Sequence, residues 1–440
     1  MTVGIQSKML YRYIGEKSTV TFGGNFMEPR RTMRRYLLLV AFGLGLCVAM
    51  GCYGTIEAAD WPNYRGPNQN GISNETGWSA TWPEDEPKQL WKKSIGNGFC
   101  SIAVSNGRAY TMGNIKDNDI LYCFQADTGK QIWKKSYPCP LFKKNHEGGP
   151  AATPTVHGDS VYTFSKNGDA IRFKAATGQI VWHKNLNKEL GVKHPTWYFA
   201  GSPFVIDNLV ILNAGTSGIA LNKTDGSLVW TNGNGACGYA TAVPFTMDTQ
   251  KCVAIFGSRD IFGLIAATGK QVCRFQWKTS YDINAADPII SGNTIFISSG
   301  YNKGCALLKI GPNNLTKVWQ NKNMRNHASS CALWKGHIYG FDGQYGGGQL
   351  SCLNYETGEV KWSQKGMGTG SLMVADGKLI ILSERGKLVT APASPEGFKE
   401  LSSAQILTGK CWTVPVLANG RIYARNAVGD LVCVDVSGKN

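Results

Sequence analysis

The sequence predicts an all-β fold, an eight-bladed β-propeller of four-stranded antiparallel blades. Three observations support this prediction. A turn motif that ends in tryptophan returns at a regular interval, each interval holds short apolar runs separated by glycine turns, and the last interval lacks a strand that the N-terminal part can supply. The 440 residues include 53 glycines, which is typical of many short strands joined by tight turns.

The repeated motif places a tryptophan four residues after a glycine, as in Gly129 and Trp133. The glycine takes the positive-φ position of a tight hairpin turn, and the tryptophan falls on the strand that follows. Two copies have lost the tryptophan and one has lost the glycine. The seven tryptophan slots hold Trp133, Trp182, Trp230, Cys273, Trp319, Trp362 and Leu401. Their spacing of 39 to 49 residues is that of propeller blades.

The two ends of the chain predict the number of blades. Residues 435–438 enter the same turn, but the sequence stops before a tryptophan, whereas Trp91 stands alone near the other end. We therefore expect the strand around Trp91 to complete the eighth blade and close the ring, which leaves no long open sheet edge.

Four short strands are expected in each blade. In the second blade they are residues 151–156, 160–164 and 170–173, followed by the strand of Trp182. Alternating apolar residues and glycine turns every eight to twelve residues indicate an antiparallel meander. The repeated indoles are expected to wedge between neighbouring blades, which gives them a structural role.

Residues 1–59 are interpreted as a targeting segment, because four arginines precede an apolar run at residues 36–51. That run is short for a membrane span. Two processing routes stay open: lipidation at Cys52, or signal cleavage near Ala58 or Ala59. Either route exports the protein, to the periplasm or to a lipid anchor at the bacterial envelope.

The charge remains basic after export. Residues 1–51 carry seven basic and two acidic side chains, so the net charge falls from +16 to +11 on their removal. No dense Lys or Arg run concentrates this charge, so a solvated basic surface is expected and nucleic acid is not an expected partner. We expect a monomer that contacts membrane only through the lipid anchor.

The thirteen cysteines are interpreted mostly as buried thiols. Cys123, Cys352 and Cys433 occupy the same position in different repeats, where a small apolar residue packs between blades. No pair has CxxC spacing, which argues against a zinc site.

Between the targeting segment and the blades lies an arm, residues 60–88, rich in Pro and Gly with aromatic anchors such as Trp61. We expect it to lie as an extended strap on the propeller, which occupies residues 89–440.

The motif and its turn resemble those of the PQQ-binding-like (quinoprotein-type) propeller superfamily, and the resemblance covers residues 89–440. Segments 61–67, 201–203, 284–288 and 421–426 are similar to an exported bacterial subgroup described by likeness to the outer-membrane assembly lipoprotein of the BAM complex. The resemblance implies a scaffold or binding module for envelope proteins. Because the superfamily also contains quinoprotein dehydrogenases, membership leaves catalysis open.

Ligand sites in a propeller form where the loops that enter each innermost strand meet at the axis. Those positions form a polar and aromatic funnel. They hold His146, Glu147, Trp197, Tyr198, Tyr239, Asn284, Asp287, Arg325, Asn326, His327 and Trp412.

A quinoprotein dehydrogenase of alcohols or sugars is the alternative function. The resemblance implies PQQ and a calcium ion held by oxygen ligands, for which Glu147, Asn284 and Asp287 have suitable chemistry. Asp287 would be the base and Arg325 would stabilise a quinol oxyanion. The cofactor would contact Trp197, Tyr239, His327 and Trp412. Many such enzymes have two adjacent cysteines beside the cofactor, and this chain has no such pair.

Two non-catalytic interpretations also remain. The funnel residues can hydrogen-bond to one another and to water, with His146, His194 and His327 as structural histidines. Alternatively, Arg325, Arg421 and Arg425 can bind a small polar or anionic ligand without chemistry. The sequence therefore favours a scaffold, commits to no cofactor, and leaves the ligand open.

Overall fold

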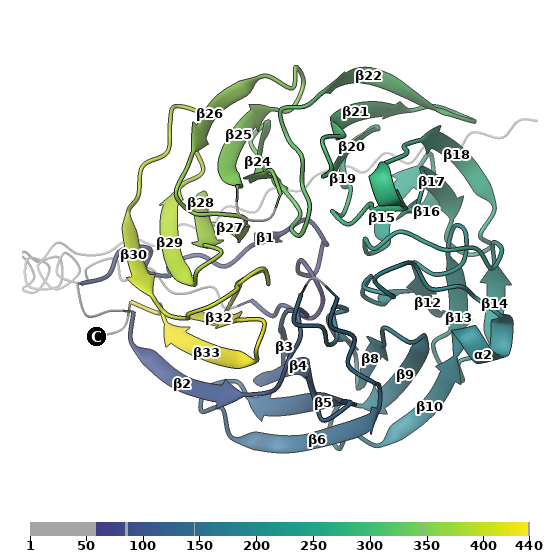
Figure 1. The fold of residues 1–440 in the computed structure, drawn as a ribbon, viewed down its shortest axis with the longest axis horizontal. Coiled ribbons are helices and arrows are strands. Elements are labelled where there is room, and N and C mark those ends of the chain that lie inside the picture. The colour runs from purple at the N-terminus through teal and green to yellow at the C-terminus, as the bar shows by residue number, and fades with distance from the viewer. Residues whose placement is uncertain (1–58, 84–86, 145, 345–346, 439–440) are drawn as a thin grey trace, which may run out of the picture. The chain divides into compact units, whose positions relative to one another are not determined.

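A computed structural model describes residues 59–83, 87–144, 146–344 and 347–438. These residues form a ring of eight antiparallel sheets, viewed along its axis in Figure 1. Helical structure in the described part is limited to the single turn α2 (Leu186–Leu190) and the 3-10 turn η1 (Ser280–Asp282). The predicted eight-bladed propeller is confirmed. The described residues contain no helix that is long and apolar enough to span a membrane.

Blades 1 to 4 each contain four consecutive strands, ordered from the axis outward. Blade 1 comprises β3 (Ala103–Ser105), β4 (Arg108–Ile115), β5 (Asn118–Gln125) and β6 (Gln131–Pro138). Blade 2 comprises β7 (Thr155–His157), β8 (Ser160–Phe164), β9 (Asp169–Lys174) and β10 (Ile180–Asn185). Blade 3 comprises β11 (Phe204–Ile206), β12 (Leu209–Leu212), β13 (Ile219–Asn222) and β14 (Leu228–Thr231). Blade 4 comprises β15 (Val243–Met247), β16 (Gln250–Phe256), β17 (Asp260–Ile265) and β18 (Gln271–Gln276).

Blades 5 and 6 repeat this order, and blades 7 and 8 each take a strand from the N-terminal part. Blade 5 comprises β19 (Ile289–Ser291), β20 (Thr294–Ser299), β21 (Gly304–Ile310) and β22 (Leu315–Asn321). Blade 6 comprises β23 (Ala332–Trp334), β24 (His337–Asp342), β25 (Gln349–Asn354) and β26 (Val360–Gln364). Blade 7 comprises β27 (Ser371–Ala375), β28 (Lys378–Leu382), β29 (Lys387–Pro392) and β30 (Ser402–Gln405), with β1 (Ile72–Ser73) added beside β27. Blade 8 comprises β31 (Val416–Ala418), β32 (Arg421–Arg425), β33 (Asp430–Asp435) and β2 (Gln89–Ser94).

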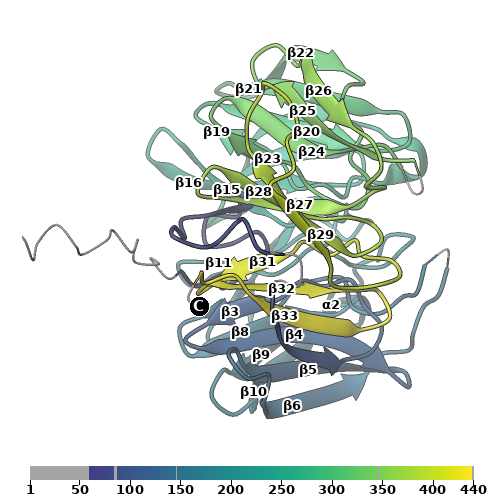
Figure 2. The same cartoon turned by 90° about the vertical axis from the view of Figure 1, so that its left-hand side faces the viewer.

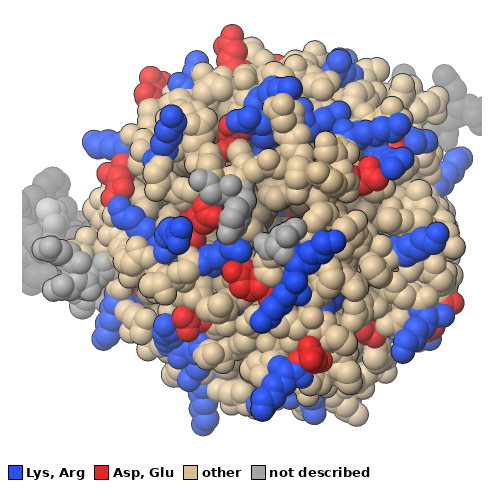
Figure 3. All heavy atoms as spheres, viewed as in Figure 1, with Lys and Arg blue, Asp and Glu red and all other residues tan. Residues whose placement is uncertain are grey.

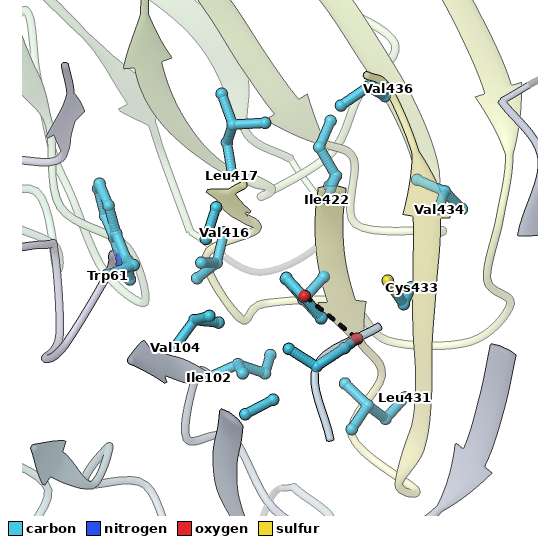
Figure 4. Close-up of a cluster of buried hydrophobic side chains, with 14 of the residues drawn as sticks. Trp61, Ile102, Val104, Val416, Leu417, Ile422, Leu431, Cys433, Val434 and Val436 are labelled. Atoms are coloured by element: carbon cyan, nitrogen blue, oxygen red, sulfur yellow. Dashed lines mark hydrogen bonds between the residues drawn. The ribbon is translucent and has the colours of Figure 1, made fainter. Parts of the chain in front are cut away.

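The ring closes as the sequence predicts. Strand β2 pairs antiparallel with β33, and Trp91 lies opposite Cys433. The closing blade contributes to a buried core shared with blade 1 and the arm, where Trp61 lies close to Val104 and Val416 (Figure 4).

Each docking tryptophan reaches the turn of the next blade. The indole N–H of Trp133, on β6, donates to the carbonyl oxygen of Ala175 in blade 2 (3.0 Å). A Cβ on Gly178 of that turn would lie 2.6 Å from the Trp133 ring. The same arrangement joins Trp182 to Gly226. The turn glycine is therefore required for its positive φ and also because a neighbouring indole occupies the space of its side chain.

The eleven described cysteines are free thiols and all are buried. The interpretation as buried thiols is confirmed for them. The remaining two of the thirteen, including Cys52, lie with the rest of residues 1–58 of the expected targeting segment outside the described residues.

The arm lies along one face of the ring and pairs with innermost strands. Trp61 forms a bridge with Val104 of β3, and the carbonyl oxygen of Pro62 accepts from the backbone N–H of Val156 on β7. Ile72 pairs with Val374 of β27. The arm thus contacts innermost strands on several sides of the axis, and Figure 2 shows it (purple) at one face of the ring.

Candidate functional site

A belt of hydrogen bonds runs around the axis just before the innermost strands. In each step a backbone N–H donates to a side-chain oxygen of the equivalent residue in the next blade. The steps are Ser101 to Thr153 (2.8 Å), Thr153 to Ser202 (2.9 Å), Ser202 to Thr241 (3.1 Å), Thr241 to Asp287 (2.8 Å) and Asp287 to Ser330 (2.9 Å). We call these six residues the axial belt. It fixes the spacing of blades 1 to 6 at the axis.

Asp287 is the one carboxylate in the axial belt. Its Oδ1 accepts the backbone N–H of Thr241, as a hydroxyl does at the other positions. Its Oδ2 is buried and has no hydrogen-bond partner, and the residue is only 5% exposed. Burial raises the pKa of Asp287 to about 6, and the nearby Arg65 partly opposes this rise. The carboxylate is therefore costly to bury and carries an unused acceptor.

Three belt residues, Ser202, Thr241 and Asp287, line a cavity of about 710 Å³ at the axis. Figure 3 shows a hollow at the centre of the face viewed in Figure 1, with lysine and arginine side chains around it. Aromatic rings make up much of the wall. They belong to Tyr64, Phe99, Phe142, Trp197, Phe199, Tyr239, Tyr301 and Trp412. A concave, mainly apolar site of this size with a few polar groups is typical of small-molecule binding.

Six of the residues expected at the axis line this cavity: His146, Trp197, Tyr239, Asp287, His327 and Trp412. His327 has a buried Nδ1 without a hydrogen-bond partner among the described residues, and its ring packs edge-on against Tyr301. His146 does have a structural contact, because its Nδ1 accepts the backbone N–H of Gly148 (3.0 Å). Burial lowers the pKa of both imidazoles.

Tyr239 and Trp197 are held together on one wall. The Tyr239 hydroxyl accepts the backbone N–H of Trp197 (3.3 Å), and burial raises the pKa of this hydroxyl to about 12. Trp412 stacks on Phe99 with ring centroids 5.6 Å apart, and its indole N–H donates to Glu384 (3.4 Å). The Trp412 ring is therefore held by neighbouring side chains, and on the other wall Tyr239 is bonded to the backbone of Trp197.

Other expected residues are engaged outside the cavity lining. Glu147 forms an ion pair with Lys410 (3.0 Å). The guanidinium of Arg325 binds both carboxylate oxygens of Asp342, at 2.9 and 2.7 Å.

Asn284 is a structural residue. Its amide N–H₂ donates to the carbonyl oxygens of Gly257 (2.9 Å) and Ser258 (3.0 Å), and its Oδ1 accepts from Ser299 (2.7 Å). The side chain is completely buried. Its hydrogen bonds connect blades 4 and 5, and its side-chain oxygen Oδ1 already accepts the Ser299 hydroxyl.

The expected calcium ligands therefore do not fit a calcium ion. Asn284 and Glu147 are absent from the cavity lining and have their own partners, which leaves Asp287 alone at the axis. The described residues also contain no group of three or more His, Cys, Asp or Glu side chains that could hold a metal ion. Calcium needs six to eight oxygen ligands, so the donor set falls short.

The three arginines considered for an anion site do not converge. Arg425 is fully buried and donates to the backbone carbonyl oxygens of Met112 and Gly96. Arg421 lies near Asp127 (3.3 Å), and Arg325 is bound by Asp342. Lys166 is the one lysine or arginine among the described lining residues.

Several lining residues escaped the sequence reasoning. Lys166, Tyr301 and Gln344 lie in turns between the second and third strands of their blades. In a meander these turns lie at the same end as the loops that enter the innermost strands, so the strand order alone could have identified them. Phe142 lies on the same entry loop as His146, between β6 and β7. Tyr64 belongs to the arm, which has no repeat register to place it.

Tyr64 and Arg65 bring the arm to the Asp287 sector. Burial, and then the Asp287 charge, raise the pKa of the Tyr64 hydroxyl to about 12. Arg65 is buried and donates to the carbonyl oxygen of Cys331 in blade 6. Its Nη1 has no partner. The arm thus forms part of the cavity wall next to the one acidic belt residue.

Comparison with known proteins gives one family match, to the family described as outer membrane protein assembly factor BamB, over residues 73–184 and 116–364. BamB of Moranella endobia is 23% identical over 363 residues, which cover 80% of each chain. Tetrathionate hydrolase of Acidithiobacillus ferrooxidans is 25% identical over 247 residues, which cover 53% of this chain but only 47% of the hydrolase.

Two solved structures show the same fold. BamB from Moraxella catarrhalis has a TM-score of 0.59 at 14% identity, covering 79% of this chain and 99% of that chain. A quinohemoprotein alcohol dehydrogenase from Comamonas testosteroni has a TM-score of 0.60 at 13% identity, covering 87% and 81%. At such identities the likeness concerns the propeller and not its activity.

Proposed function

Because the chain belongs to the family described as outer membrane protein assembly factor BamB, we propose that it is an exported scaffold propeller of the bacterial cell envelope. It binds envelope proteins through its loop surfaces and takes part in assembling outer-membrane proteins. The observation that carries this proposal is the family match, which runs across most of a closed eight-bladed ring. The likeness of BamB from Moranella endobia over 80% of each chain supports it.

The engagement of the axial charges also favours a scaffold over redox catalysis. Arg325 and Glu147, which were candidates for quinone chemistry, are held in ion pairs at 2.7 and 3.0 Å. These pairs brace loops next to the axis, as a rigid binding surface requires.

Deletion of the gene in its own host tests the assembly role. We expect less folded β-barrel protein in the outer-membrane fraction, restored by the wild-type gene. The Asp287→Asn variant should restore it equally well, because this change alters the axial cavity and leaves the loop surfaces intact. Unchanged outer-membrane protein levels after deletion would refute the proposal.

The location is a part of the same proposal: the periplasm, or a lipid anchor at Cys52. Metabolic labelling with a radioactive fatty acid, compared between wild type and Cys52→Ser, distinguishes the two. Label on the wild type alone supports the anchor, whereas unlabelled protein in the periplasmic fraction supports cleavage near Ala58 or Ala59. Recovery of the mature protein in the cytoplasm contradicts export.

A quinoprotein dehydrogenase remains the second candidate, favoured by the aromatic axial cavity with the free carboxylate oxygen of Asp287. PQQ carries three carboxylates, and the described lining offers one cation, Lys166, so the residues present fit this cofactor poorly. Incubation with PQQ and calcium, followed by dye-linked oxidation of alcohols and sugars, tests this candidate. Turnover together with retained cofactor would establish it over the scaffold. The hydrolase relative is matched over less than half its length.

A further inference from the structure

We propose that the axial cavity is a binding site for a neutral saccharide, held between the aromatic walls and the free polar atoms of Asp287 and His327. This inference does not depend on the scaffold role, because the cavity lies on the axis and an envelope partner would contact the loops.

The size and walls of the cavity suit a ring-shaped ligand with apolar faces. Its volume of about 710 Å³ lies within the range of small-molecule sites, about 300–1,000 Å³. Trp197 and Trp412 both line it, and the Trp412 ring is fixed by its stack on Phe99. Flat indole faces bury apolar surface, which the C–H faces of a sugar ring present.

The polar atoms indicate what the edges of the ligand carry. Asp287 Oδ2 and His327 Nδ1 are buried atoms without a partner, and both residues line the cavity. They come from neighbouring blades, since the backbone N–H of Asp287 binds Ser330, three residues after His327. Buried polar atoms are normally hydrogen-bonded. A carboxylate oxygen only accepts a hydrogen bond, so the ligand must offer a donor such as a hydroxyl.

The charge balance of the wall favours a neutral ligand. Among the described lining residues Lys166 is the one cationic and Asp287 the one acidic side chain, and the lowered pKa values of His146 and His327 keep both imidazoles neutral at pH 7. Lys166 already donates to the carbonyl oxygen of Pro140. A ligand with net charge would lose its hydration without an opposite charge in excess. A compound with several hydroxyls and no charge avoids this cost.

Further hydrogen-bonding groups around the wall match a polyol. Gln344 carries an amide, and Ser202, Thr241 and Thr413 carry hydroxyls. The Ser202 and Thr241 hydroxyl oxygens already accept backbone N–H groups of the belt and keep an O–H to donate, whereas the Thr413 hydroxyl donates to Phe99 and keeps an acceptor. Each hydroxyl of a sugar both donates and accepts, so it can bind either kind of group. Aromatic faces with such edges therefore select a saccharide over an apolar compound.

The experiment is calorimetric titration of the purified protein with glucose, N-acetylglucosamine, maltose and cellobiose. Choline and PQQ serve as a cationic and an anionic probe. We expect at least one saccharide to bind with a Kd of about 1 mM or tighter. Binding of choline or PQQ with no saccharide bound overturns the proposal, as does the absence of any binding at 50-fold higher saccharide, about 50 mM.

Two variants test the named contacts. Asp287→Asn turns the free acceptor into a donor and should weaken saccharide binding about tenfold or more, the usual effect of losing a hydrogen bond to a charged group. Trp197→Ala should weaken it similarly through loss of the stacking face. Asp207→Asn is the matched control, because Asp207 is exposed and pairs with Lys251 (2.6 Å) outside the cavity. Equal affinity in Asp287→Asn, Trp197→Ala and Asp207→Asn refutes the site even if a saccharide binds.

Discussion

The docking of tryptophan on a turn glycine can be tested with two glycines of blade 2. Gly178 has φ +69 and its added Cβ would lie 2.6 Å from the Trp133 ring, whereas Gly158 has φ +60 and an added Cβ meets nothing within 4 Å. Alanine at either position therefore suffers left-handed backbone strain. Only alanine at position 178 must also displace an indole.

The two costs can be separated in magnitude. Left-handed strain costs about 1–2 kcal/mol, and this is the whole expected loss of unfolding free energy for Gly158→Ala. Overpacking against a fixed side chain adds about 1–3 kcal/mol, so Gly178→Ala should lose about 2–5 kcal/mol. Trp133 cannot retreat easily, since its indole N–H is bonded to Ala175 (3.0 Å).

Urea unfolding followed by far-UV circular dichroism measures both losses. A double-mutant cycle supplies the control: in a Trp133→Ala background the ring is gone, and Gly178→Ala should then cost only the strain, about 1–2 kcal/mol. If Gly178→Ala is no more harmful than Gly158→Ala, or if its cost is unchanged without Trp133, the steric argument is wrong.

Three further predictions concern buried polar groups. The folded pKa of Asp287, about 6, exceeds the unfolded value of about 3.9, so the unfolding free energy of the wild type falls as pH rises between these values. The unfolding free energy of Asp287→Asn should therefore rise by up to about 3 kcal/mol relative to wild type between pH 4 and pH 7. A difference between the two proteins that does not change with pH in urea titrations would contradict this. Glu75 is fully buried and accepts the backbone N–H groups of Asn419 (2.7 Å) and Gly420, so Glu75→Ala should cost about 1–3 kcal/mol in the same assay, whereas the exposed Glu356→Ala should leave stability nearly unchanged. The eleven buried thiols should react with a thiol reagent only after denaturation, and rapid modification of any of them in native protein, located by mass spectrometry, would show that its burial is wrong.

The fold was predictable because the motif repeats. The same turn and strand pattern repeats at each slot from Trp133 to Leu401. A blade whose tryptophan is replaced, as at Cys273, can therefore still be located from the spacing of its neighbours. Ring closure followed from one unpaired strand at each end. The steric requirement for glycine at the turns was not predictable. The ring that occupies the space of a Gly178 side chain is that of Trp133, which lies in another blade and forty-five residues earlier in the chain.

The candidate site was predictable only in part, for a physical reason. Entry loops converge at the axis in any propeller, and this placed Trp197, Asp287 and Trp412. Residue type does not reveal whether a side chain is already bonded, however. Asn284 and Asp287 look alike as oxygen ligands in the sequence, yet Asn284 is saturated by backbone and hydroxyl partners while Asp287 retains a free oxygen.

The pairing of β2 with β33 has a consequence for the order of events in a cell. Strand β2 needs the last strand of the propeller as its partner, so the ring cannot close until nearly all of the polypeptide has been synthesised. Contacts so distant along the chain form slowly, and until then the edges of both strands stay open to pairing with other chains. A chain whose synthesis stops late, or that is cleaved near its C-terminus, should therefore remain an open ring with exposed strand edges that is prone to aggregation.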